Sequence, residues 1–196
     1  MIPALAFILV VISSAIATSL RIPFGNTPAR FSKRTMDELS ANLSVTIGLP
    51  CTNSTLNPAD PLELTASVHN NNPNQAVTLL KWNTPLDPQA NVLGVFEIRE
   101  AECGTPVESL IVKISRKLPP TQDDLVEIPA NGVKVVQVTL RPMGFSVGHQ
   151  YKISAKGRWQ ALWAGGLNDV TATDSVNMAC ATSGNFESNE VMVSFK

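Results

Sequence analysis

Apolar and polar residues alternate with a period of two through most of the chain after its first forty residues. The alternation is clearest at 62–69 and 150–156, where every second residue is apolar, and it returns at 191–195. A period of two places the apolar side chains on one face of a β-strand. Fourteen prolines, most of them between these runs, argue against long helices. The sequence therefore predicts an all-β protein.

Turn-forming clusters divide the chain into about eight expected strands. We expect these strands at 43–49, 62–69, 77–82, 95–100, 108–115, 132–141, 149–158 and 186–195. The interval 159–183 fits either a further strand near 171–178 or a long loop. Short strands separated by turns at regular spacing are typical of an antiparallel sandwich. The predicted fold class is an antiparallel, immunoglobulin-like β-sandwich of about eight strands.

The first 17 residues are almost wholly apolar and end in a small-x-small pattern at Ala15 and Ala17. A signal peptidase accepts this pattern. The apolar run stops before Arg21, short of the about 20 residues that a membrane-spanning helix needs. A signal anchor is the alternative, because no Lys or Arg precedes the apolar core. We predict that residues 1–17 are a signal peptide and that the mature protein is secreted and extracellular, with no membrane attachment.

Residues 18–34 form a basic segment that ends in the pair Lys33-Arg34. A dibasic pair in a flexible segment beside a signal peptide is typical of a processing site, so we predict cleavage there. The alternative is a pair of solvated surface charges. The whole chain has a net charge of −1, and the first 34 residues hold four bases and no acid, so residues 35–196 carry −5. This acidic remainder, expected to be a single domain, lacks the basic balance of a nucleic-acid-binding protein.

Three cysteines and two glycan acceptor sequences fit a protein of the secretory route. Cys51, Cys103 and Cys180 allow three alternative disulfides, each of which leaves one thiol over. That thiol is either buried, which we favour, or joins two chains. The triplets that begin at Asn42 and Asn53 are predicted N-glycosylation sites.

The order of segments from residue 43 to about 157 resembles a known non-catalytic domain. The matching segments are 43–48, 62–70, 77–87, 96–98, 119–124, 128–132 and 148–151, and the most specific is Leu80 to Asp87. They are similar to the amino-terminal β-sandwich of the deuterolysin and peptidyl-Lys metalloendopeptidase family, which precedes the zinc protease domain. Asn131 departs from the family pattern, and Cys51 and Cys103 have no counterpart in it. The resemblance implies an accessory domain that is linked to the folding and latency of a protease.

The zinc motif of that family is absent from this chain. Two His one helical turn apart hold the metal in the motif His-Glu-x-x-His, whereas His69 and His149 stand alone in this sequence. No Gly-x-Ser-x-Gly nucleophile motif occurs either. We therefore expect a protein that is not an enzyme and that uses no metal or other cofactor.

Two tryptophans at the start of the ambiguous interval are candidate partner contacts. Arg158, Trp159 and Trp163 lie between glycines, and Trp and Arg dominate many binding hot spots. A helical turn would place both tryptophans on one face. The other interpretation, which we favour, is that both tryptophans fill the open end of the sandwich.

Two hypotheses for function follow from these observations. The first is a protein-binding module that engages a secreted deuterolysin-type metalloprotease as an inhibitor or folding assistant. The alternative is a structural or effector protein that binds glycans or foreign proteins at the cell exterior. A shared fold does not choose between them. The sequence leaves the oligomeric state open.

Overall fold

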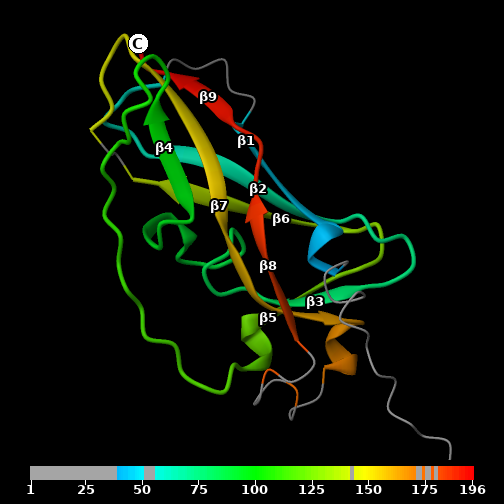
Figure 1. Ribbon diagram of the computed structural model, residues 1–196. Helices are drawn as coiled ribbons and strands as arrows, with labels where there is room; N and C mark the ends of the chain where they lie inside the picture. The colour runs from blue at the N-terminus through cyan, green and yellow to red at the C-terminus, as the bar shows by residue number, and fades with distance from the viewer. Residues whose placement is uncertain (1–38, 51–55, 142–143, 171–173, 175–177, 179–180) are drawn as a thin grey trace, which may run out of the picture. The chain divides into compact units, whose positions relative to one another are not determined.

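A single long strand, β7 (Gln150–Ala164), organises the larger of two antiparallel sheets. The computed structural model describes residues 39–50, 56–141, 144–170, 174, 178 and 181–196. In Figure 1, β7 runs the length of the view, with β4 (Phe96–Glu100) on one side and β8 (Thr182–Glu187) and β9 (Val191–Ser194) on the other. The strand β3 (Val77–Leu80) also pairs with β7, and β5 (Leu125–Ile128) pairs with β3.

The second sheet lies behind β7 and has the order β1-β2-β6. It consists of β1 (Leu43–Gly48), β2 (Leu62–Asn70) and β6 (Val133–Leu140). Three short 3-10 helices, η1 (Ala90–Val92), η2 (Gln122–Asp124) and η3 (Leu167–Asp169), lie in the connections. No helix among the described residues is long and apolar enough to cross a membrane.

The apolar residues of the alternating runs form the core between the two sheets. Every second residue of β2, from Leu62 to Val68, is buried, and so is every second residue of β7 from Tyr151 to Ala155. Burying each Val, Leu or Ile side chain of this set contributes on the order of 1.5–3 kcal/mol. These residues belong to one hydrophobic cluster that spans both sheets. The predicted immunoglobulin-like β-sandwich is therefore confirmed.

Several predicted strand boundaries are wrong. The expected strand at 108–115 is an irregular extended segment, β5 was not expected, and the run 186–195 is divided into β8 and β9. Residues 105–107, and not this segment, pair with the outer edge of β4. The amide of Glu100 donates to the carbonyl of Thr105 at 2.9 Å, and the amide of Val107 donates to the carbonyl of Ile98 at 2.9 Å.

A β-bulge in β7 explains why the interval after residue 158 was ambiguous. The pairing of β7 with β8 shifts register between Trp159 and Leu162. A bulge re-aims the side chains that follow it. Trp159 and Leu162 therefore face the main core, whereas Ala161 and Trp163 belong to a second cluster with Trp82. Both faces of this half of β7 are covered, so its sequence is apolar without alternation.

The second cluster is tied to η2 through Asp124. Trp82 Nε1 donates to Asp124 Oδ1 at 2.8 Å, and the amide and hydroxyl of Thr121 donate to Asp124 Oδ2 at 2.8 and 2.7 Å. Desolvation raises the pKa of Asp124, but these hydrogen bonds and the charge of Lys81 outweigh it, so the pKa is lowered overall. The ionised carboxylate is thus the form that the folded protein favours.

Truncating Trp159 tests its place in the core. The side chain is 0% exposed and packs against Phe186, with ring centroids 4.5 Å apart and ring planes tilted by 41°. We expect Trp159→Ala to lower the free energy of unfolding by about 3–5 kcal/mol, as cavity-forming aromatic truncations do. Arg158→Ala, at an exposed neighbouring position, should change it by less than about 1 kcal/mol. Urea unfolding measures both, and equal effects of the two variants would contradict this placement.

Replacing Asp124 with Asn tests whether the ionised carboxylate stabilises the fold. A lowered folded pKa means that the carboxylate adds stability above its ordinary pKa, and that this stability is lost as the pH falls through the lowered value. We expect Asp124→Asn to cost about 1 kcal/mol at neutral pH, and the cost to shrink below about pH 4. Urea unfolding across this pH range is the measurement, with the exposed Asp123→Asn as its control. A cost that does not change with pH would rule out the proposed role of the charge.

Candidate functional site

One edge of β7 is interrupted between β4 and β3. Residues Tyr151 to Ala155 of β7 pair with β4, and Leu162 to Ala164 pair with β3. Both strands lie on the same edge, because β8 and β9 occupy the opposite one. No described strand pairs with residues 157–161 on the β4/β3 edge. We call this interruption the gap.

The chain makes the gap by leaving the sheet after β3 and returning to it only at β4. It turns away at Asn83, which has a φ of 56°, and returns through Gly94, which has a φ of 73°. The left-handed conformation favours glycine and tolerates asparagine. The amide of Lys156 donates to the carbonyl of Val95 at 3.0 Å, which marks the end of the gap at β4.

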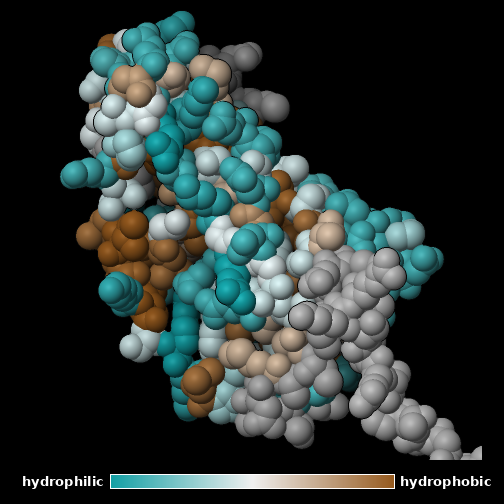
Figure 2. All heavy atoms as spheres, in the orientation of Figure 1, coloured by the Kyte–Doolittle hydropathy of each residue, from teal (hydrophilic) through white to brown (hydrophobic). Residues whose placement is uncertain are grey.

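Residues 108–118 form the other wall of the site, and we call this segment the ridge. Three of its apolar side chains are largely exposed: Leu110 (76%), Ile111 (62%) and Leu118 (66%). Figure 2 shows hydrophobic atoms gathered on this face, where the segment descends from β4 to η2 in Figure 1. A cluster of exposed apolar side chains is typical of an interaction surface.

The ridge is anchored at its carboxyl-terminal part by a buried ion pair. Arg116 Nη2 lies 2.5 Å from Asp87 Oδ2, whose side chain is fully buried, and its guanidinium lies 5.9 Å from the centroid of Trp82. Asp87 also accepts hydrogen bonds from the amides of Asn83 and Gln89 at 2.9 and 3.0 Å. Since breaking one partner of a buried pair is strongly unfavourable, this contact holds the ridge beside the gap.

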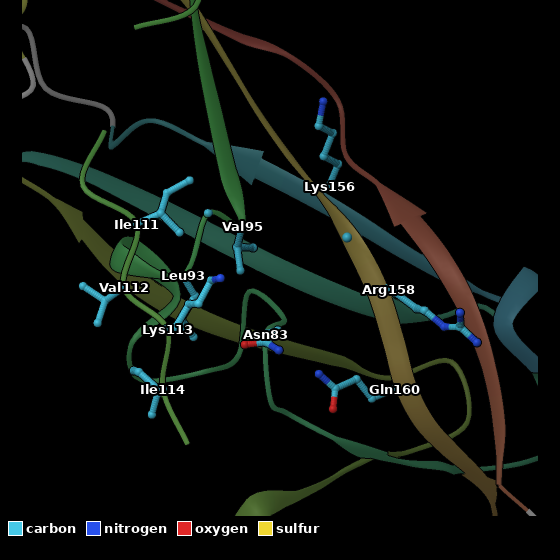
Figure 3. Close-up of a pocket in the computed structure, with 12 residues that line it drawn as sticks. Asn83, Leu93, Val95, Ile111, Val112, Lys113, Ile114, Lys156, Arg158 and Gln160 are labelled. Carbon is cyan, nitrogen blue, oxygen red and sulfur yellow. The ribbon is translucent and has the colours of Figure 1, made fainter. Parts of the chain in front are cut away.

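A groove of ≈ 460 Å³ lies between the ridge and β7. Figure 3 shows Ile111, Val112 and Lys113 on one side, β7 on the other and Asn83 between them. The polar residues that line the groove are Asn83, Lys113, Lys156, Arg158 and Gln160, and no acidic residue lines it. Three bases thus line the groove, although the net charge of residues 35–196 is −5.

Two of the three bases have partners, and in Figure 3 Arg158 points away from the ridge, toward β8. Lys156 Nζ pairs with Glu97, and Arg158 Nη2 donates to Ser183 Oγ at 2.7 Å. The hydrogen bond from Lys156, together with Arg99 and against partial desolvation, lowers the pKa of Glu97. The side chains of Asn83, Lys113 and Gln160 have no hydrogen-bond partner within the described part of the chain, so their donors and acceptors are open to a ligand.

Of the predicted partner contacts, only Arg158 lies at the groove. The interpretation of Trp159 and Trp163 as partner contacts is wrong, because both belong to β7 and are 0% and 4% exposed. They also point to opposite faces of the strand, so the helical turn is wrong too. The interpretation that they fill the interior agrees with the structure.

The histidines and the described cysteine lie away from the groove. His149 Nδ1 lies 2.5 Å from Glu100 Oε1, and the Cys103 thiol donates to Glu100 Oε2 at 2.8 Å. The bond from Cys103 and then that from His149 lower the pKa of Glu100. Cys103 is a free, exposed thiol, contrary to our expectation that the unpaired cysteine is buried. His69 lies on β2, 3.0 Å from Thr46 Oγ1.

Other predicted sites are only partly covered by the structure. Asn42 is half-buried and directly precedes β1, and its carbonyl accepts a hydrogen bond from the amide of Asn71 at 2.8 Å. Use of this sequon remains a prediction. The predicted sites at Ala15, Ala17, Lys33, Arg34, Cys51, Asn53 and Cys180 lie outside the described residues. Among the residues that are described, no three His, Cys, Asp or Glu side chains are placed to hold a metal ion.

Sequence reasoning missed most of the groove. Asn83, Lys113 and Gln160 come from three distant segments, and no motif in the sequence links them. One signal was present, because Leu110, Ile111 and Val112 are consecutive and do not alternate with polar residues. Such a run fits a strand buried on both faces or an exposed apolar patch, and here it is the patch.

Comparisons with known proteins found a matching domain family, a secreted relative and a distantly similar solved structure. Residues 53–195 match the family model of the immunoglobulin-like domain. An uncharacterized secreted protein of Arthroderma benhamiae is 38% identical over 166 residues, which cover 83% of this chain and 84% of that protein. Among solved structures, PapD-like domain 7 of human CEP192, an ASH/PapD-like domain, is 14% identical with a TM-score of 0.30, and the match covers 74% of this chain and 82% of that chain.

The predicted secretion of the protein is confirmed by its similarity to the Arthroderma benhamiae protein over most of both chains. The sandwich topology and the family match over residues 53–195 agree with each other. The chain therefore belongs to the immunoglobulin-like domain family, as a secreted member.

Proposed function

We propose that this chain is a secreted, non-enzymatic protein-binding module, and that the ridge and the groove form its binding surface. The observation that carries the proposal is the exposure of Leu110, Ile111 and Leu118 beside a groove lined by bases. Burying these side chains against a partner would stabilise the complex at about 25 cal/mol per Å² of apolar area. The flanking bases would select the orientation of the partner.

The lining of the groove supports binding in preference to catalysis. It contains no Ser, Cys, His, Asp or Glu, and these residue types supply most nucleophiles and general acid–base groups. It also contains no aromatic side chain on which a sugar ring could stack. A polypeptide partner therefore fits the groove better than the alternative of a glycan.

The resemblance to the deuterolysin accessory domain supports the fold more than a shared binding surface. In its most specific segment, Thr84, Pro85, Leu86 and Asp87 are all buried. The polar groups of this segment are used internally, since Thr84 Oγ1 donates to the carbonyl of Lys81 at 2.7 Å and Asp87 holds Arg116. The hypothesis that the partner is a secreted metalloprotease, to be inhibited or assisted in folding, therefore rests on the accessory role that the resemblance implies and not on a shared binding surface.

The ridge is tested by removing its apolar side chains. The partner is first cross-linked to the protein in culture fluid, identified and purified. We expect the triple variant Leu110→Ser, Ile111→Ser, Leu118→Ser to bind this partner at least tenfold more weakly than wild type, as measured by calorimetry. Exposed apolar changes elsewhere, Val133→Ser, Val147→Ser and Met192→Ser, provide the matched control and should bind as wild type. Undiminished binding by the ridge variant, or equal loss in both variants, would show that the ridge is not the contact.

The metalloprotease hypothesis is tested directly with a purified deuterolysin-type protease. Addition of the secreted protein at micromolar concentration should lower the protease activity or raise its refolding yield, because an accessory domain acts by contact with the catalytic domain. The ridge variant should lack this effect. Unchanged activity together with unchanged refolding yield would exclude this class of partner.

A further inference from the structure

We propose that the bound partner contributes an extended, acidic segment that adds to β7 as a strand in the gap between β3 and β4. This inference rests on the proposed function and specifies the part of the partner that enters the groove. Three features of the described residues carry it: the orientation of the backbone at Arg158, the size of the groove and the sign of its charge.

The backbone of Arg158 faces the gap. Successive amides along a strand point to opposite edges, so residues two apart point to the same edge. The amide of Lys156 donates to Val95 on the β4/β3 edge, and the amide of Ser188 donates to the carbonyl of Ala155 on the other edge. The amide and carbonyl of Arg158 therefore point into the gap, where no described strand residue is paired with them.

An unpaired strand edge is a template for another strand. Its donors and acceptors recognise any extended backbone, and peptide-binding domains use such edges for strand addition. At about 3.3 Å per residue, the gap opposite residues 157–161 spans roughly 16 Å. A groove of ≈ 460 Å³ beside it can hold a few residues of extended chain.

The charge of the groove determines which kind of partner segment fits it. Lys113, Lys156 and Arg158 line it without an acidic residue. Lys156 is paired with Glu97, and Arg158 points toward β8 in Figure 3, so Lys113, which has no ion-pair partner within the described structure, supplies the unpaired charge that faces the groove. The wall formed by Leu93, Val95 and Ile111 is apolar. A strand presents alternate side chains to opposite faces, so a segment in which acidic and apolar residues alternate matches both features.

The probe is a synthetic peptide, acetyl-Thr-Val-Glu-Val-Asp-Val-Thr-amide, titrated into the 15N-labelled secreted protein. We expect the amide resonances of Arg158 and Gln160 to shift. A neutral twin, with Gln and Asn in place of Glu and Asp, should bind about fivefold more weakly because it lacks the charge. A twin N-methylated at its three central amides should bind at least about tenfold more weakly, because it cannot form the strand hydrogen bonds.

A charge reversal on the protein provides a matched pair of variants. Both Lys113 and Lys117 are exposed on the ridge, but only Lys113 lines the groove. Lys113→Glu should weaken binding of the acidic peptide about fivefold and leave binding of the neutral twin unchanged, whereas Lys117→Glu should leave both unchanged. Unfolding of either variant in urea should match wild type, since both positions are exposed.

Failure of this inference is distinguishable from failure of the proposed function. If the acidic peptide shifts no amide between Gly157 and Ala161, or if N-methylation leaves its affinity unchanged, strand addition is wrong. The ridge variant still decides separately whether the chain binds a protein partner there. If sedimentation of the free protein shows self-association that is abolished by Lys113→Glu, a second copy occupies the gap and the inference of a partner segment is overturned.

Discussion

Pairing along β7 is the constraint on which the larger sheet depends. Every strand of that sheet except β5 is paired with it, and β5 is joined through β3. One edge of β7 is followed by β9 and β8 almost continuously, while the other is shared by β4 and β3 with the gap between them. The place at which a partner strand can enter is thus set by the same ladder that stabilises the fold.

The gap persists because the segment that creates it is held by its own buried polar contacts. Between β3 and β4 the chain folds outward, and Asp87 accepts bonds from two backbone amides and from Arg116. Asp87 is fully buried, so removing Arg116 would leave an uncompensated charge. One network therefore keeps the chain out of the gap and also fixes the ridge opposite it.

Much of the fold was predictable because alternation reports burial on one face. It identified β2 and the first half of β7 from their own residues, and the turn clusters separated them. The alternation was absent at Ala161 to Trp163, where the side chains on both faces of the strand are buried. It was also absent at Leu110 to Val112, where all three apolar side chains are exposed. It also missed β5, since only Leu125 and Ile128 of its four residues are buried, three positions apart.

The candidate site was far less predictable than the fold. Arg158 was singled out beside two tryptophans that prove to be core residues. The groove itself depends on β3 and β4 sharing one edge of β7, and that pairing is a long-range property that no local pattern reports. Asn83 and Lys113 line the same groove only because of it.

Hydrogen exchange along β7 in the free protein shows whether the gap is open. Backbone amides that are paired in a ladder exchange through opening of the sheet, whereas an amide that faces an open edge exchanges without it. The structure predicts that the amide of Arg158 exchanges at least about tenfold faster than those of Gly157 and Trp159, which face β8. Equal protection of all three amides would mean that the edge of β7 at Arg158 is already paired, and that no partner strand can enter there.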